Sequence, residues 1–267
     1  MAEQPPITVV DHALEAGVAR VLTLGHGDRR SPIDARMASA LRARLAEADA
    51  SESVRVVVVT GEGPAFSAGG DLRGYLALYR DEAAFRAFLD DFEAACHLLE
   101  RGRFASIARV NGDCVAGGLE LMLACDVAIA ATTARIGDGH LKFGQLPGAG
   151  GSQRLCRTIG LQPARWLLLT GRLVDGREAQ AMGLVTSTAA PEDLEAQTLA
   201  LAAEIARHSP LAVERMKSLI ALSQDELRPV GLAAEIEVVA RYATTSHDAT
   251  EGLHAFLERR PPRWSGR

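Results

Sequence analysis

The spacing of apolar positions divides the N-terminal part of the chain into elements. Ile7–Val10 and Val18–Leu24 run apolar or alternate around a turn-like segment, which predicts two paired strands. From Asp34 to Ala50 apolar residues recur at helical spacing, which predicts an amphipathic helix with Asp34 at its start. Val54–Thr60 is continuous in β-branched residues and is predicted to be a buried strand.

The next segment, Leu72–Arg101, is predicted to be mostly helical and carries a row of aromatic residues. These residues lie about one or two helical turns apart. Rows of this kind usually pack in a core, which is the expectation here, and lining an apolar pocket is the alternative. The aromatic residues are Tyr75, Tyr79, Phe85, Phe88 and Phe92.

Short strands surround a short helix in the middle of the chain. Strands are predicted at Ile107–Val110, Asp126–Ala131 and Ala134–Gly137, and a helix at Gly118–Ala124. This order indicates a layered α/β core whose successive turns stack. After Gly151 the only predicted strand is Leu184–Ser187, and the predicted helices are Gln153–Ile159, Pro163–Thr170, Gly176–Met182, Leu194–His208, Leu211–Leu222, Asp225–Tyr242 and His247–Arg259.

Composition and charge narrow the classes of function. The chain of 267 residues, 48% hydrophobic, can bury a substantial core, and no Pro/Ser-rich linker divides it, which favours one large domain. Its net charge of −5, with Lys and Arg scattered, offers no basic stripe for nucleic acid or a membrane surface. No apolar run approaches bilayer length, and the first residues lack a secretion signal. A soluble protein that handles metabolites is expected.

The cysteines indicate a reducing compartment. Cys96, Cys114, Cys125 and Cys156 form no CxxC pair and have no histidine at metal-ligand spacing. We expect reduced core thiols, no metal site and a cytoplasmic protein.

Two turns of small residues carry the main chemical signal. Ser67–Gly70 and Ala116–Gly118 each follow an apolar strand and are predicted to open a helix. Small residues let a ligand approach the main chain, and the first amides of a helix are unpaired, so such turns suit an oxygen that becomes negative. Glu120 lies three residues after Gly117, on the same helical face, which places a carboxylate beside one amide donor.

Further motifs follow one another along nearly the whole chain. They are FSAGGDL at Phe66–Leu72, NG(x)nGGxEL at Asn111–Leu121, CDVAIA at Cys125–Ala130, PGAGGSQRL at Pro147–Leu155, LLTGR at Leu168–Arg172, AxxxGLV at Ala179–Val185 and EGLHAFLERRPP at Glu251–Pro262. With these motifs the chain resembles the enoyl-CoA hydratase/isomerase (crotonase) superfamily.

The resemblance implies an α/β fold, a crotonase-like spiral of ββα units with a C-terminal helical trimerisation region. The spiral core would occupy residues 1–200 and the helical region residues 201–267. The implied substrates are acyl-CoA thioesters, so coenzyme A would be part of the substrate rather than a permanently bound cofactor. Homotrimers, often paired into hexamers, are the implied assembly.

The resemblance also implies roles for individual residues. The amides of Ala68 and Gly117 would hold the thioester oxygen of an enolate, and Glu120 matches the first of two glutamates that hold water and transfer protons in hydratases of the family. The implied coenzyme A contacts are Arg29, Arg30, Ser67, Gly70, Asp71 and Leu72, with Phe256 and Arg259 reaching coenzyme A on a neighbouring subunit.

The chain departs from the family pattern at the second glutamate, where it carries His140. A histidine moves protons near neutral pH and could replace the carboxylate as acid and base. Asp138 could supply a carboxylate instead, or orient His140. One family branch, hydrolases that cleave carbon–carbon bonds in cyclic β-diketones, resembles this loop, but it has an aspartate where this chain has Ala149.

The expected activity is hydration of a 2-enoyl-CoA to a 3-hydroxyacyl-CoA, a lyase reaction of fatty acid metabolism. The alternatives are an enoyl-CoA isomerase, a CoA-ester or β-diketone hydrolase that uses His140, and a non-catalytic acyl-CoA-binding protein.

Overall fold

Strands in two sheets form the core of the protein. The computed structural model describes residues 5–267, apart from the side chain of Arg29. The strands are β1 (Ile7–Leu14), β2 (Gly17–Leu24), β3 (Val54–Gly61), β4 (Ala65–Ser67), β5 (Ala105–Val110), β6 (Asp113–Val115), β7 (Val127–Ala131), β8 (Arg135–Gly137), β9 (Val174–Asp175) and β10 (Ser187–Ala189).

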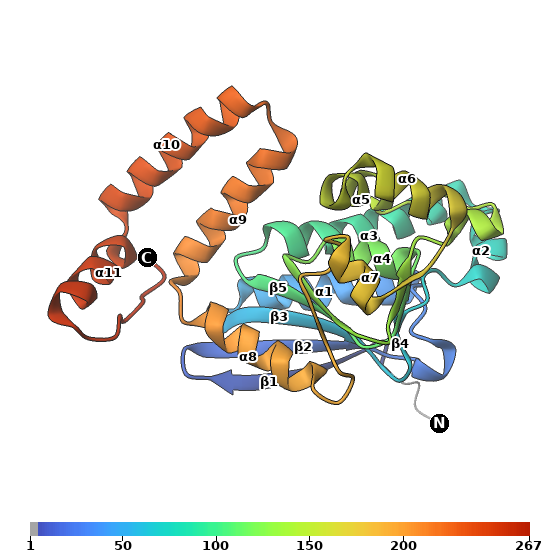
Figure 1. The fold of residues 1–267 in the computed structure, drawn as a ribbon, viewed down its shortest axis with the longest axis horizontal. Coiled ribbons are helices and arrows are strands. Elements are labelled where there is room, and N and C mark those ends of the chain that lie inside the picture. Colours follow the sequence, from blue (N-terminus) through green and yellow to red (C-terminus); the bar gives the residue numbers. More distant parts are fainter. Residues whose placement is uncertain (1–4) are drawn as a thin grey trace.

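Helices surround these sheets and extend beyond them at the C-terminal end (Figure 1). Two short 3-10 helices are η1 (Gly27–Arg29) and η2 (His140–Phe143). The α-helices are α1 (Ala35–Ala50), α2 (Leu72–Leu78), α3 (Glu82–Arg101), α4 (Gly117–Leu123), α5 (Gly151–Ile159), α6 (Leu161–Thr170), α7 (Gly176–Ala181), α8 (Leu194–Ala206), α9 (Pro210–Asp225), α10 (Arg228–Thr245) and α11 (His247–Glu258).

Successive strand pairs place one strand in each sheet. One sheet has the strand order β1-β2-β3-β5-β7-β10 and the other β4-β6-β8-β9. In each of the pairs β3 and β4, β5 and β6, and β7 and β8, the first strand belongs to the first sheet and the second strand to the second sheet. From β2 to β10 the neighbours in the first sheet run parallel, and a helical segment follows each pair. The chain therefore winds as a spiral of ββα units, and the expected α/β fold is confirmed.

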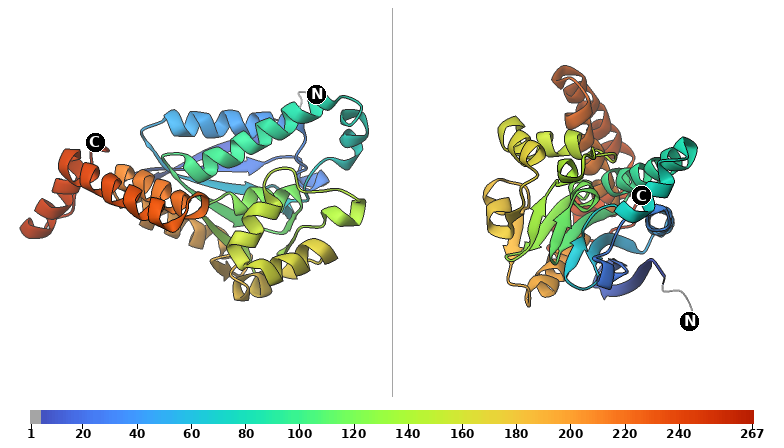
Figure 2. Two further views of the ribbon diagram at one scale, coloured as in Figure 1. Left: turned by 90° about the horizontal axis from the view of Figure 1, so that it is seen from above. Right: turned by 90° about the vertical axis from the view of Figure 1, so that its right-hand side faces the viewer.

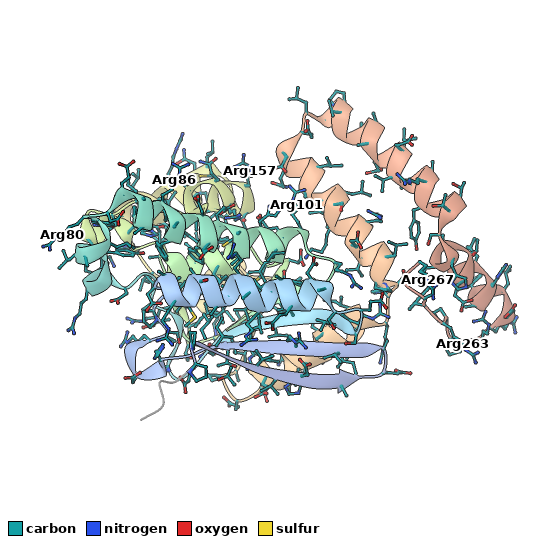
Figure 3. The ribbon with its side chains drawn as sticks, turned by 180° about the vertical axis from the view of Figure 1, so that it is seen from behind. Arg80, Arg86, Arg101, Arg157, Arg263 and Arg267 are labelled. Carbon is teal, nitrogen blue, oxygen red and sulfur yellow. The ribbon has the colours of Figure 1, made fainter. Side chains whose placement is uncertain are left out.

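Strand β3 shows why its sequence is continuously apolar. Val57 and Val59 belong to the core shared with α1 and α3, whereas Val56 and Val58 pack with the residues of α8. Side chains alternate between the two faces of a strand, so a strand covered on both faces is apolar at every position. Figure 1 shows α8 on the near face of the sheet, and Figure 3 shows α1 on the opposite face.

Most of the predicted elements are confirmed. Asp34 caps α1 by accepting a hydrogen bond from the Met37 N–H at 2.8 Å. The predicted helical stretch 72–101 is divided at Asp81, which caps α3. The predicted helix start at Asp225 was wrong, because this residue ends α9.

The strand predicted at Leu184–Ser187 was placed too early, and β9 was missed. The Leu184 N–H donates to the Ala179 carbonyl at 2.8 Å and the Gly183 N–H to Gln180 at 3.0 Å, so the apolar pair Leu184 and Val185 closes the end of α7. This turn is a helix C-cap with its hydrophobic contact, and an apolar run of two residues cannot distinguish it from a strand.

The last three helices extend away from the sheets (Figure 2). The ammonium group of Lys217 on α9 is buried and donates at 2.7 Å to the carbonyls of Leu99 and Phe104, and it also lies 2.7 Å from the Asp126 carboxylate. Arg101 of α3 forms an ion pair with Asp225 of α9 (Figure 3). The predicted boundary between residues 200 and 201 falls inside α8, which packs on the sheet. Within residues 5–267, no helix is long and apolar enough to cross a membrane.

Candidate active site

The first small-residue turn is built on a buried serine. Ser67 has no exposed surface, and its hydroxyl donates to the Ser31 carbonyl at 2.8 Å and accepts from the Gly69 N–H at 3.1 Å. The Ser67 hydroxyl is thus occupied within the turn, and the predicted contact with coenzyme A stays a prediction. The hydroxyl supports the loop from below, because a small polar side chain can satisfy the buried backbone groups of a tight turn.

The amide of Ala68 is not free, contrary to the expectation. It donates to the Arg30 carbonyl at 3.0 Å, while the Ile33 N–H donates to the Gly69 carbonyl at 2.8 Å. The chain before α1 thus runs beside the turn and occupies the amide of Ala68. Among the described residues the amide of Gly70 has no partner, and Gly70 lines the cavity described below. In this turn Gly70 therefore carries the unpaired amide beside the cavity.

The second turn presents the amide of Gly117 as expected. Ala116, at the N-cap of α4, has φ 53° and ψ −116°, a conformation that costs a non-glycine residue free energy. This backbone turn leaves the Gly117 amide at the first helical position, unpaired within the described residues. A Cβ built on Gly69 would lie 3.2 Å from the Gly117 nitrogen, so the two turns are in contact.

Close approach of the turns predicts a large cost for a small substitution. A Cβ at Gly118 would overlap the Ser67 carbonyl, so Gly118→Ala must displace backbone. We expect Gly118→Ala to lower the free energy of unfolding by about 3 kcal/mol in urea titration. The matched control is Gly231→Ala in α10, where a Cβ has no neighbour within 4 Å and a gain of about 1 kcal/mol is expected. Equal effects of the two substitutions would contradict this geometry.

Glu120 is buried in α4 with one carboxylate oxygen held and the other directed at a histidine. Its Oε1 accepts from the N–H groups of Ala149 at 2.7 Å and Gly151 at 2.9 Å, at the start of α5. Its Oε2 lies 3.9 Å from Nε2 of His140. Burial raises the pKa of Glu120 above its ordinary value, although the two amides and His140 act in the opposite direction.

His140 is held by Asp138 through both its backbone and its ring. The carboxylate of Asp138, 1% exposed, accepts from the His140 N–H at 3.0 Å and lies 2.9 Å from ring Nδ1. Gly139 between them has φ 72°, which allows this tight turn. Because an ionised carboxylate only accepts, it holds the Nδ1 proton and directs the other ring nitrogen toward Glu120.

The charge of this loop favours a protonated histidine. Burial lowers the pKa of His140, but the hydrogen bond and charge of Asp138, with the charge of Glu120, outweigh burial and raise the pKa above its ordinary value. Glu120 Oε2 and His140 Nε2, 3.9 Å apart, thus form a carboxylate–imidazole pair beyond direct hydrogen-bond distance, and a proton can pass between them through one water.

The pair lies in a small cavity lined by the predicted aromatic residues. Its volume is about 40 Å³, and its wall includes Gly70, Gly117, Glu120 and His140. Phe88 and Phe92 are buried in the core and Tyr75 and Phe85 pack against it, so the expected core packing is confirmed, and the row lines a pocket as well. The aromatic side chains in the wall are Tyr75, Tyr79, Phe85, Phe88 and Phe92.

A larger groove of about 560 Å³ leads to this cavity, and it contains some of the predicted coenzyme A contacts. Asp71 and Leu72 line it, together with Gly70. The side chain of Arg30 does not line the groove and forms an ion pair with Asp113 at 2.7 Å. The side chain of Arg29 lies outside the described part of the structure.

The C-terminal pair, predicted to reach coenzyme A on a neighbouring subunit, does not line this groove of its own chain and stays a prediction. Phe256 lies on α11 and Arg259 caps it, in the helical extension that leaves the core (Figure 1). Three features of the site were not predicted from the sequence. Tyr75 and Gln145 line both the cavity and the groove, and the Ala149 N–H donates to Glu120. The glycine run after Pro147 was the signal for the last, since helix starts bind carboxylates.

Comparison with known proteins gives consistent matches over the whole chain. Residues 14–267 match the family model described as enoyl-CoA hydratase/isomerase. The 2,3-dehydroadipyl-CoA hydratase of Escherichia coli is 36% identical over 249 residues, which cover 92% of this chain and 95% of that protein.

Solved structures agree with these sequence matches. An enoyl-CoA hydratase from Bacillus anthracis superposes with a TM-score of 0.91 at 31% identity, covering 98% of this chain and all of that one. Pseudomonas aeruginosa DspI gives a TM-score of 0.89 at 32% identity, covering 99% and 98%.

Proposed function

Since the chain belongs to the enoyl-CoA hydratase/isomerase family, we propose that it hydrates a 2-enoyl-CoA to a 3-hydroxyacyl-CoA. The observation that carries this proposal is the juxtaposition, in one cavity, of two unpaired amides and a carboxylate–imidazole pair. Hydration needs a place for a developing oxyanion and groups that move two protons, and this cavity supplies both.

The amides of Gly70 and Gly117 hold the thioester oxygen in the proposed reaction. When water adds to C3, negative charge develops on that oxygen as the enolate forms. Two preorganised donors stabilise the charge, and each typically contributes a factor of about 10² to 10³ in rate. This assignment replaces Ala68 by Gly70, because the Ala68 amide is engaged with Arg30.

Glu120 and His140 move the protons. The ionised carboxylate of Glu120 takes a proton from water as the water oxygen bonds to C3, and the protonated ring of His140 gives a proton to C2. The product therefore carries the hydroxyl at C3 and the added hydrogen at C2. Transfer of the proton from Glu120 Oε2 to His140 Nε2 through one water, across 3.9 Å, restores the starting state.

Product mass is the direct test of this assignment. Incubation with crotonyl-CoA is expected to give a product heavier by one water, with coenzyme A still attached. The second candidates are isomerisation, which leaves the mass of a 3-enoyl-CoA unchanged, and hydrolysis, which releases an acid. The hydrogen bond between Asp138 and His140 favours keeping the hydrolase among these candidates, because such pairs act as general bases. Acyl-CoA binding without turnover would indicate a non-catalytic protein.

The dependence of activity on pH follows from the directions of the two pKa shifts. Activity is expected to rise as Glu120 ionises and to fall as His140 loses its proton. Because the pKa values of both groups are raised, the acidic limb should lie above the pKa of a free glutamate, about 4.3, and the basic limb above that of a free histidine, about 6.5. A profile of kcat against pH for the hydration of crotonyl-CoA measures the two limbs, which belong to the coupled pair. A basic limb below pH 6 would contradict the protonated role of His140.

We propose a homo-oligomer, with the trimer as its unit, in the cytoplasm. The exposed apolar side chains of the helical extension support this proposal, because apolar residues gathered on a free surface favour association. The four cysteines, free among the described residues, fit a reducing compartment. The exposed residues are Leu232, Ile236 and Val239 on α10 and Leu253, Phe256 and Leu257 on α11.

A further inference from the structure

Tyr75 stands between the groove and the inner cavity. It lines both spaces, together with Gly70, His140 and Gln145. A Cβ built on Gly70 would overlap the Tyr75 hydroxyl, so the phenol lies directly over Gly70. The ring of Tyr75 therefore lies at the junction of the groove and the cavity that holds Glu120.

Neighbouring aromatic rings hold Tyr75 in this position. Its ring stacks on Tyr79 at 5.4 Å between centroids and meets Phe88 at 5.9 Å and Phe85 at 6.2 Å. Tyr79 in turn donates a hydrogen bond to the side chain of Gln145. Aromatic contacts of this geometry stabilise one another, so displacing one ring disturbs the whole wall.

The inner cavity is small for an acyl group. At about 40 Å³ it holds about three water-sized groups, given roughly 10 to 15 Å³ for each. With the thioester carbonyl at the amides of Gly70 and Gly117, this space is shared by the attacking water and the acyl carbons next to the carbonyl. Further carbons would meet the aromatic wall.

We propose that Tyr75 is a specificity-determining residue that limits the substrates to short-chain acyl-CoA thioesters. The inference rests on the proposed function, since it assumes that an acyl-CoA occupies the groove. Removal of the ring would widen the cavity on the side of α2, the helix that carries Tyr75. Helix α2 has no buried residue, so a longer chain could leave there toward solvent.

Binding of saturated acyl-CoAs tests this proposal without requiring any reaction. Calorimetry would give dissociation constants of coenzyme A, butyryl-CoA and octanoyl-CoA for the wild-type protein and for Tyr75→Ala, Tyr75→Phe and Leu76→Ala. In the wild type, octanoyl-CoA should bind at least about tenfold more weakly than butyryl-CoA, because extra methylenes do not fit. Tyr75→Ala should abolish this ratio, and Tyr75→Phe should keep it because the ring remains. Leu76, 73% exposed on the same helix, is the matched control and should also keep it.

The outcomes separate the two proposals. Equal binding of butyryl-CoA and octanoyl-CoA by the wild type would overturn the length limit while leaving the proposed function in place. So would an unchanged ratio in a folded Tyr75→Ala, or a loss of the ratio in Tyr75→Phe. Failure of coenzyme A and both thioesters to bind would overturn the proposed function and this inference with it.

Discussion

Glu120→Gln is expected to lower kcat for the hydration of crotonyl-CoA by about 10³-fold, with little change in KM. Glutamine keeps the shape of the side chain, and its oxygen can still accept from the amides of Ala149 and Gly151. Its amide nitrogen then faces His140 and cannot take a proton from water. Steady-state kinetics on the variant measures the loss of the base without the loss of the fold.

Two controls make this result specific to Glu120. Thermal unfolding should show that the variant remains folded, since both backbone donors keep an acceptor. Glu204→Gln removes the same charge from an exposed position on α8 and should change kcat by less than about twofold. Wild-type turnover in Glu120→Gln would remove Glu120 from the mechanism.

Asp138→Asn is expected to lower kcat at neutral pH by about 10²-fold and to move the basic limb of the pH profile to lower pH. The asparagine oxygen would stay with the His140 N–H, which leaves the amide NH₂ against ring Nδ1. The ring then loses the donor bond at Nδ1 and the negative charge that raises the pKa of His140. Both effects reduce the fraction of His140 that is protonated at neutral pH. Profiles of kcat against pH for the wild type and Asp138→Asn measure the shift of the basic limb.

Asp138 is proposed to act through His140, and a double mutant tests this. In a His140→Ala background, Asp138→Asn should cost little further activity, because coupled residues are not additive. Asp90→Asn, at an exposed position of α3, should leave the limb unchanged. A full additional 10²-fold loss in the double mutant would sink the positioning role.

The sequence could predict elements whose signals are local. The alternation in β1 and β2, the cap at Asp34 and the periodicity of α3 each depend on neighbouring residues, and each is present in the structure. The strand β10 was predicted too early because a short apolar run closes a helix as readily as it begins a strand.

The site was partly predictable for the same reason. Glu120 and Gly117 lie within one turn of a helix, and Asp138 lies two residues before His140, so their proximity follows from the sequence. The amide of Ala68 was assigned wrongly because its partner, the Arg30 carbonyl, comes from a segment whose path no local pattern gives.

Local sequence patterns were sufficient for most strands and helices, for the two small-residue turns, and for the departure from the family at His140. Contacts between distant segments place the Ala68 amide on Arg30 and leave that of Gly70 unpaired, set Glu120 Oε2 opposite His140 Nε2, and put Tyr75 in the walls of both cavity and groove. The physical reason is that local patterns report the hydrogen bonds and side-chain faces within one element. Which donor stays unpaired, and how much room an acyl group has, depend on segments that meet only when the chain is folded.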